Sequence, residues 1–422
     1  MNNLATDMAP PFVLVAHYFI AGAIFYLISS AVLPFFANDL GSIFLTSSIA
    51  SLSHLYLLGF VMMVIFGAMY QLIPVVLEIP IFSKDFAYIQ FYLYVVGIVI
   101  FSWALQFDKY EVIPYGAMLI YLSMLIFVAN IFLTYKELKT YNIIAKFLLA
   151  SNVFLFISVT IGIFIAFNLK YGFYSGDIYN LVAGHIAGTI GGYVLMTIMG
   201  VAMILLPMFA LAHNFSQKPI ERAFYIITAG LAIFIIFSLF EVKFLQIIGL
   251  ILIAIATGFG LYQMQLIFKG RIRKGYDYYN KNMVASFGFL IFSIVIMAIA
   301  FLTDSDKLKL LFGFSMFFGF FVFFIVGHIY KILPFLVWFQ RYSPLVGKQK
   351  VPMLNDMIDE KIADIQFWLT FTGTIIASIA ILFSGSWLFI LGTGIIFISS
   401  ILVIYNIYFS LVYGLKDLKK GE

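Results

Sequence analysis

Long apolar stretches, separated by short polar loops, recur along the whole chain. A helix needs about 20 consecutive apolar residues to cross the hydrocarbon core of a bilayer. Backbone polar groups in lipid must bond within their own segment, so helices are expected rather than the shorter, alternating strands of a barrel. The pattern predicts an all-α polytopic membrane protein with about twelve transmembrane helices, at 11–34, 46–77, 86–106, 112–134, 143–168, 179–211, 219–239, 243–268, 282–302, 309–339, 363–384 and 386–414.

Composition agrees with this interpretation. Hydrophobic residues make up 64% of the 422 residues and charged residues only 10%, whereas about a quarter of the residues of a soluble domain are charged. The N-terminal sequence MNNLATDMAPP has no basic region of the kind that opens a signal peptide, and it leads straight into a full-length span. We therefore expect residues 1–422 to form one transmembrane domain.

The distribution of basic residues predicts the orientation. Cytoplasmic loops next to membrane spans collect Lys and Arg. If the N-terminus is cytoplasmic, most of the 24 Lys and Arg face the inner side; Lys331 lies within the tenth span, and the outer loops hold only Lys109, Lys170, Lys243, Lys307 and Lys309. Both termini are thus predicted to be cytoplasmic, in a multi-pass protein of the cell's inner membrane. No soluble basic domain carries the net charge of +5, so no nucleic-acid partner is expected.

One short motif recurs three times. In spans two, six and ten a glycine precedes a proline by seven residues, in GAMYQLIP (Gly67–Pro74), GVAMILLP (Gly200–Pro207) and GHIYKILP (Gly327–Pro334). Such residues are common in membrane helices, but the steps between the motifs are similar and each falls four spans after the last. The spacing predicts three parallel four-helix units related by a pseudo-threefold axis, at about 1–139, 140–272 and 273–422.

The chain contains no cysteine and five histidines. Thiolate zinc sites, iron–sulfur clusters and covalent c-type haem attachment are therefore excluded. Histidine is the expected ligand of any metal or haem. Histidines inside a membrane are rare and commonly functional.

Two histidines are predicted to lie near the outer face. His54 precedes Pro74 by 20 residues and His185 precedes Pro207 by 22, which places both about 30 Å from their prolines at ~1.5 Å per residue. Two imidazoles at one depth suit a six-coordinate haem iron. Beside His185, span six carries a smooth face of Gly184, Gly188, Gly191 and Gly192, which admits either a haem ring or a neighbouring helix.

Two further histidines are predicted to lie nearer the inner side, at similar depths. His17 lies a few residues into span one, and His328 lies late in span ten. They could ligate a second haem or another metal, with Lys331 and Arg341 near its propionates. Alternatively they are structural and bond to hydroxyl groups such as those of Tyr18 or Tyr330. His213 follows span six and is predicted to be interfacial.

The motifs resemble those of two related families. The segment HLYLLGFVMMVIFGAMYQLIP is similar to span two of subunit I of the haem–copper oxidases and nitric-oxide reductases, which begins on a histidine ligand of the low-spin haem. NnrS-type haem-containing membrane proteins are also similar, through PFVLVAHYF, HLYLLGF and HIAGTIGGYVLMTIMG. The resemblance implies twelve spans and b-type haem.

The chain departs from these families at the catalytic centre. The outer half of span ten, LLFGFSMFFGFFVFF, lacks the family's His-x-His, and span seven lacks its copper-ligating histidines. We therefore expect no copper site, and neither standard oxygen nor standard nitric-oxide reduction, although a non-standard oxidoreductase remains open. The sequence predicts a protein with one or two b-type haems, at His54 and His185 and at His17 and His328, that transfers electrons or binds NO or O₂.

From this interpretation we expect the lipid bilayer and haem as partners, and a quinol or a cytochrome as a possible electron donor. A homo-oligomer is also possible. The rival interpretation is a membrane transporter or channel whose histidines are structural. Acidic residues are nearly absent from the spans, so a proton-coupled carrier would lack its usual relay.

Overall fold

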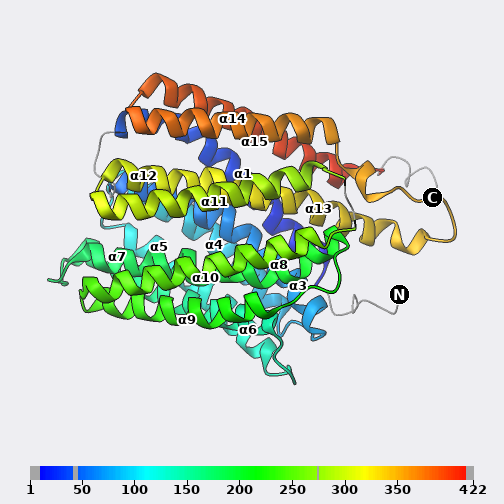
Figure 1. The fold of residues 1–422 in the computed structure, drawn as a ribbon, viewed down its shortest axis with the longest axis horizontal. Helices are drawn as coiled ribbons and strands as arrows, with labels where there is room; N and C mark the ends of the chain where they lie inside the picture. The colour runs from blue at the N-terminus through cyan, green and yellow to red at the C-terminus, as the bar shows by residue number, and fades with distance from the viewer. Residues whose placement is uncertain (1–9, 41–45, 273–274, 415–422) are drawn as a thin grey trace. The chain divides into compact units, whose positions relative to one another are not determined.

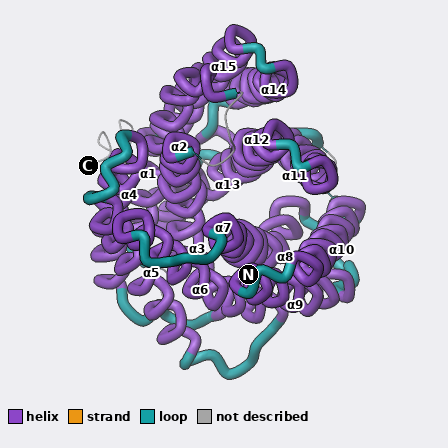
Figure 2. Tube along the Cα trace, turned by 90° about the vertical axis from the view of Figure 1, so that its left-hand side faces the viewer, coloured by secondary structure: helices purple, strands orange, loops and turns teal. Residues whose placement is uncertain are grey.

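The computed structural model describes residues 10–40, 46–272 and 275–414. Throughout these residues the chain forms helices and connecting loops without any strand (Figures 1 and 2). Twelve of the described helices are long and apolar enough to cross a membrane, with mean hydropathies between 1.8 and 2.6. This confirms the prediction of an all-α, multi-pass membrane protein.

The chain packs as two compact units. Of the described residues, the first contains Pro10, 69–272 and 275. It comprises the end of α3 (Met63–Leu77) and then α4 (Lys84–Gln106), α5 (Ile113–Tyr135), α6 (Ile143–Tyr171), α7 (Ile178–Ile186), η4 (Ala187–Leu195), α8 (Met196–Ala210), α9 (Lys218–Leu239) and α10 (Lys243–Lys269). Segments α7, η4 and α8 run on as one long sixth span.

The second unit joins the described residues 11–40 and 46–68 to residues 276–414. Its N-terminal part holds α1 (Phe12–Val32), η2 (Leu33–Asp39), α2 (Ser47–Tyr56), η3 (Leu57–Met62) and the start of α3. Its C-terminal part holds α11 (Tyr278–Thr303), α12 (Asp306–Phe314), η5 (Ser315–Phe321), α13 (Val322–Arg341), η6 (Ser343–Leu345), η7 (Leu354–Met357), α14 (Glu360–Phe383) and α15 (Ser386–Val412).

The predicted boundaries differ most where a span begins among charged residues. The ninth and eleventh spans start at Tyr278 and Glu360, not at 282 and 363. Each helix starts early because an aspartate precedes it as N-cap: the Asp277 carboxylate accepts a hydrogen bond from the backbone N–H of Asn280 (3.0 Å), and that of Asp359 from Ile362 (3.1 Å). The apolar pattern could not locate these polar first turns.

Three helix hairpins repeat the same close glycine contact. Three pairs of helices pack side by side: α4 with α5, α9 with α10, and α14 with α15. Figure 1 shows the α9–α10 and α14–α15 pairs. In each pair two glycines 19 residues apart hold the backbones together; a Cβ atom on any of them would come within 3.0 Å of the facing helix. They are Gly97 and Gly116, Gly230 and Gly249, and Gly373 and Gly392.

The Gly–Pro spans show a second repeated contact. Fifteen residues before Pro74, Pro207 and Pro334 stands another glycine, and each packs on a phenylalanine of the preceding span: Gly59 on Phe25, Gly192 on Phe154 and Gly319 on Phe289. Both sets of contacts support the predicted threefold repeat. The boundaries of the repeat units and their common axis stay predictions, and the two compact units cut across the repeats.

The same three spans contain π-helical segments that the sequence pattern did not predict. Segments η3, η4 and η5 each end 12 or 13 residues before the proline of their span. A π-helix displaces carbonyl groups from the regular hydrogen-bond ladder, and such segments are frequent at functional sites. In η5 the freed carbonyls have partners: Tyr56 Oη donates to Phe317 O (2.6 Å), and Thr374 Oγ1 donates to Phe318 O (3.0 Å).

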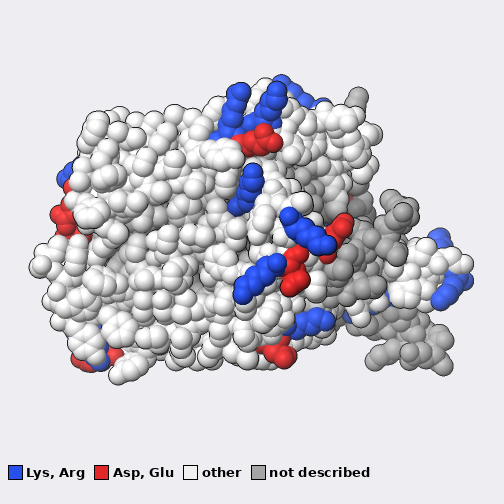
Figure 3. Space-filling model, turned by 90° about the horizontal axis from the view of Figure 1, so that it is seen from below, with Lys and Arg blue, Asp and Glu red and all other residues white. Residues whose placement is uncertain are grey.

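Charged side chains are concentrated toward the ends of the helices. On the face drawn in Figure 3, a broad band carries no Lys, Arg, Asp or Glu, and the charges gather toward one end and at the opposite margin. Burying a charge in hydrocarbon is costly, so this band is the expected lipid contact. Five basic residues counted on the inner side, Arg273, Lys274, Lys416, Lys419 and Lys420, lie outside the described residues.

The predicted orientation can be tested with single cysteines, because the chain has no cysteine of its own. Lys109 and Lys139 are exposed at opposite ends of α5. In intact spheroplasts, a membrane-impermeant maleimide should label Lys109→Cys and leave Lys139→Cys unlabelled until the cells are opened. If only Lys139→Cys is labelled in intact spheroplasts, the orientation is the opposite of the predicted one.

Candidate functional site

His54 lies on α2, two residues before that helix ends and three before η3 begins. The helix is capped by Thr46, whose hydroxyl accepts a hydrogen bond from the N–H of Ile49 (3.2 Å). The imidazole is half-buried, and its Nδ1 lies 2.7 Å from the carbonyl oxygen of Ala50, one turn earlier. The ring is thus fixed to its own helix just before the π-helical segment.

His185 occupies a similar place in span six, two residues before η4 begins. Its Nδ1 lies 2.8 Å from the carbonyl oxygen of Ser158 on α6. The Ser158 hydroxyl in turn donates to the His185 carbonyl (2.7 Å), which also accepts from the Thr189 hydroxyl (2.9 Å). Gly162 of α6 makes room for the ring, since a Cβ there would lie 2.8 Å from His185 Cε1.

His328 is the most deeply buried of the five histidines, with 5% of its surface exposed. Its Nδ1 lies 2.7 Å from the carbonyl oxygen of Phe324, one turn earlier on α13. Its Nε2 lies 3.4 Å from the hydroxyl of Tyr279 on α11, and the rings of Phe324 and Tyr279 pack around it. A hydrogen bond to a hydroxyl group was the alternative to haem ligation for this histidine. The hydroxyl belongs to Tyr279, not to Tyr18 or Tyr330 as we suggested.

His17 is half-buried on α1, and α1 contacts α13, which carries His328. The inner pair therefore meets its first requirement, that its two helices be neighbours. His213 is exposed beyond the end of α8. The proposed outer pair is divided between the units, because His54 belongs to the second unit and His185 to the first.

Three of the imidazoles share one protonation pattern. A carbonyl oxygen can only accept a hydrogen bond, so Nδ1 of His54, His185 and His328 must carry the proton. In the neutral ring the lone pair then resides on Nε2. This is the form in which histidine ligates a metal, with its other nitrogen held by a carbonyl group.

The glycine face beside His185 serves helix packing. A Cβ at Gly192 would lie 2.5 Å from Phe154 Cβ, and one at Gly188 2.9 Å from Ser158 Cβ, both on α6; Gly191 faces Leu231 of α9. These contacts support the alternative of close helix association. The case for a ligand at this site therefore rests on the orientation of the imidazole.

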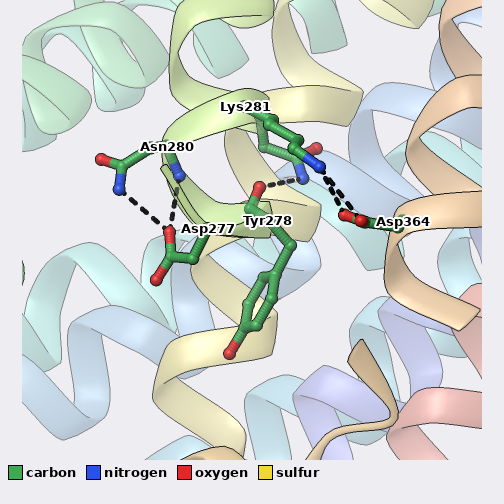
Figure 4. Close-up of polar contacts among 6 residues, drawn as sticks. Asp277, Tyr278, Asn280, Lys281 and Asp364 are labelled. Carbon is green, nitrogen blue, oxygen red and sulfur yellow. Dashed lines mark hydrogen bonds and ion pairs between the residues drawn. The ribbon is translucent and has the colours of Figure 1, made fainter. Parts of the chain in front are cut away.

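The cations assigned to an inner haem have protein partners. Lys331 Nζ lies 2.9 Å from the Asp277 carboxylate and 4.7 Å from the ring centre of Tyr278, and Arg341 Nη1 donates to the carbonyl of Tyr413 (3.3 Å). Figure 4 shows Asp277 at the start of α11, close to a second ion pair between Lys281 and Asp364. Lys331 thus anchors the N-terminal end of α11.

We expect Asp277→Ala to lower the free energy of unfolding by about 1–3 kcal/mol, since it removes an N-cap worth ~1 kcal/mol and leaves the partly buried Lys331 without its carboxylate. Thermal unfolding in detergent measures this. The control is Asp304→Ala, whose exposed carboxylate pairs with Lys309 and should matter little. Equal effects of the two substitutions would contradict the anchoring role.

Sequence reasoning missed the residues that orient the histidines. Ser158 and Tyr279 lie on neighbouring spans, 27 and 49 positions away from the rings they contact. One signal was available: Ser29, Ser158 and Ser293 each follow the repeated phenylalanine by four residues. Aligning the repeats would have pointed to Ser158.

The described residues contain no group of three or more His, Cys, Asp or Glu that could hold a metal ion. No protein-family model and no curated protein matches the sequence.

Proposed function

We propose that the protein is a b-type haem-binding integral membrane protein that transfers electrons or binds a diatomic gas such as NO or O₂. The observation that supports this most directly is the shared geometry of His54 and His185. Each stands at the entrance of a π-helical segment, in corresponding spans of the repeat, with Nδ1 held by a backbone carbonyl.

The donor set fits a haem better than a metal ion bound by protein alone. A haem iron takes four ligands from its own ring and needs only one or two imidazoles, whereas a tetrahedral ion needs three or four side chains. The described residues contain no cluster of three or more His, Cys, Asp or Glu. His54 and His185 would hold the haem through Nε2, and the bound group would supply an iron that changes oxidation state or binds a gas.

The side chains around His185 have a distinct task in this proposal. The carbonyl of Ser158 fixes the Nδ1 proton, and the hydroxyls of Ser158 and Thr189 hold the His185 backbone where η4 begins. Fixing the ring in advance lowers the entropy lost on ligation. The Ala50 carbonyl does the same for His54.

Absorption spectroscopy of the purified protein tests the proposal. We expect a Soret band and, after reduction with dithionite, the sharp α and β bands of a low-spin haem. A colourless preparation from cells supplied with haem would instead favour a transporter or channel. That rival has one specific observation in its favour, the hydroxyl partner of His328 Nε2.

The inner histidines support a second haem less well. Its presence predicts a haem-to-protein ratio near two, falling to near one in His17→Ala and in His328→Ala. A ratio of one that neither substitution changes would make both residues structural. That result would also favour gas binding over electron transfer, because a single haem near the outer face reaches only part of the ~30 Å hydrocarbon core.

A further inference from the structure

A stripe of polar side chains follows α14 through the second unit. Gln366, Thr370, Thr374 and Ser378 recur at every fourth position, and all four are buried. Polar residues in spans often join neighbouring helices, and α14 does pack on α15. The stripe alone is therefore explained by packing.

Part of the stripe forms a closed network with α15. The Gln366 amide nitrogen donates to the hydroxyls of Thr370 (2.8 Å) and Ser399 (3.1 Å), and these two hydroxyls lie 2.5 Å apart. The Ser399 hydroxyl also donates to the backbone carbonyl oxygen of Gln366 (3.0 Å). Donors and acceptors are matched here except at the amide oxygen of Gln366.

The second unit also contains buried polar atoms that make no hydrogen bond to any described residue. A buried polar atom that stays unsatisfied is destabilising, and native proteins contain few of them. The side chains that carry them come from α1, α13 and α14 and are at most 7% exposed: Tyr26, Ser29, Ser30, Tyr330, Gln366 and Ser378.

Two tyrosines connect the group. The Tyr26 hydroxyl lies beside those of Ser30 and Thr370, and the Tyr330 hydroxyl lies beside Asn406 of α15. Neither tyrosine hydroxyl meets the geometry of a hydrogen bond there. The Asn406 amide oxygen accepts a hydrogen bond from the N–H of Asp359 (3.0 Å), the half-buried N-cap at the inner end of α14. Polar groups therefore extend from the inner end of α14 to the level of Tyr26.

The equivalent hairpins show that packing does not require this composition. In α9 and α10 the positions corresponding to Gln366 and Ser399 are Ala223 and Ala256, both fully buried. In α4 and α5 they are Gln90 and Ser123, and there the amide oxygen has a protein donor, the Tyr70 hydroxyl at 2.8 Å. Only α14 and α15 leave the glutamine oxygen without a donor among the described residues.

We propose that α1, α13, α14 and α15 bind a file of water molecules along this seam, connected to the inner solution at Asp359. Gln366 and Thr370 bond directly (2.8 Å), so the water would bind where partners among the described residues are lacking, at the Gln366 amide oxygen and at the Tyr330 hydroxyl. Buried water needs two to four polar partners, and the hydroxyls and amides supply them. The seam would bring solvent to mid-membrane and lower the cost of a charge there.

Radiolytic hydroxyl labelling of the whole protein in nanodiscs, read by mass spectrometry, tests the proposal, because buried side chains are labelled only where water is bound beside them. Tyr26 and Tyr330 should be labelled clearly above Tyr70, which is equally buried but bonded to Gln90. Labelling of both at the level of Tyr70 would show a dry seam and overturn the proposal.

Rapid mixing with ¹⁸O-water tests the connection to the inner solution. The label on Tyr26 should acquire ¹⁸O as fast as the label on exposed Tyr110. Much slower uptake would show sealed water and overturn the connection.

Two matched variants assign the water to the seam. Thr370→Val removes a buried hydroxyl at nearly constant volume and should lower Tyr26 labelling to the level of Tyr70. Thr372→Val makes the same change on the exposed side of α14 and should leave it unaltered. If both variants keep the original labelling, the water lies elsewhere. None of these measurements depends on haem.

Discussion

Replacement of His54 or His185 by alanine is expected to remove the low-spin haem spectrum or convert it to a five-coordinate one. Each imidazole would hold the haem through Nε2, with its Nδ1 proton bonded to the carbonyl oxygen of Ala50 or Ser158. Loss of either ligand leaves an open position on the iron or releases the haem. The measurement is the reduced spectrum and haem content of each purified variant.

His213→Ala is the matched control, because this histidine is exposed and lies beyond the end of α8. Its haem content and spectrum should equal those of the unmodified protein. If only one of the two ligand variants becomes five-coordinate, the other histidine is not the partner ligand. Unchanged haem in both variants would remove these residues from the site.

The glycines in the π-helical segments should tolerate added volume poorly. A Cβ at Gly192 would lie 2.5 Å from Phe154 Cβ, and one at Gly59 2.6 Å from Phe25 Cγ. Overpacking of this kind costs typically 1–3 kcal/mol and sometimes more. We therefore expect Gly192→Ala and Gly59→Ala to lower the free energy of unfolding by about that amount, measured by SDS titration in mixed micelles.

Gly288→Ala provides the comparison, because nothing lies within 4 Å of a Cβ at this position on α11. There alanine should be neutral or stabilising by up to ~1 kcal/mol through its higher helix propensity. Combining Gly192→Ala with Phe154→Ala should cost less than the sum of the two single changes, since contacting residues couple. Similar losses for Gly192→Ala and Gly288→Ala would contradict the packing account.

The sequence was sufficient for the number and class of the helices, because bilayer thickness imposes a length on every apolar segment. The sequence also contained signs of the threefold repeat besides the Gly–Pro spacing. The paired glycines of the hairpins, 19 residues apart, and the serines four residues after Phe25, Phe154 and Phe289 are visible in the chain. They gain meaning only when the facing helix is known.

Other features could not be predicted from the pattern. A π-helical segment differs from an α-helix by one residue in a turn, and η3 or η5 reads as an ordinary apolar run. The partner of His328 is equally hidden, because Tyr279 lies on another span and is one of 26 tyrosines. The candidate histidines were found because they are rare in membrane spans, while their orientation depends on tertiary contacts.

The central claim is that His54 and His185 hold a haem, and its most direct test is the pyridine haemochrome assay on protein purified from haem-sufficient cells. The account predicts at least one b-type haem per chain in the unmodified protein, and a loss of one haem per chain in the His54→Ala/His185→Ala double variant with the helical circular dichroism retained. A haem-free unmodified protein, or a double variant with undiminished haem, would contradict it.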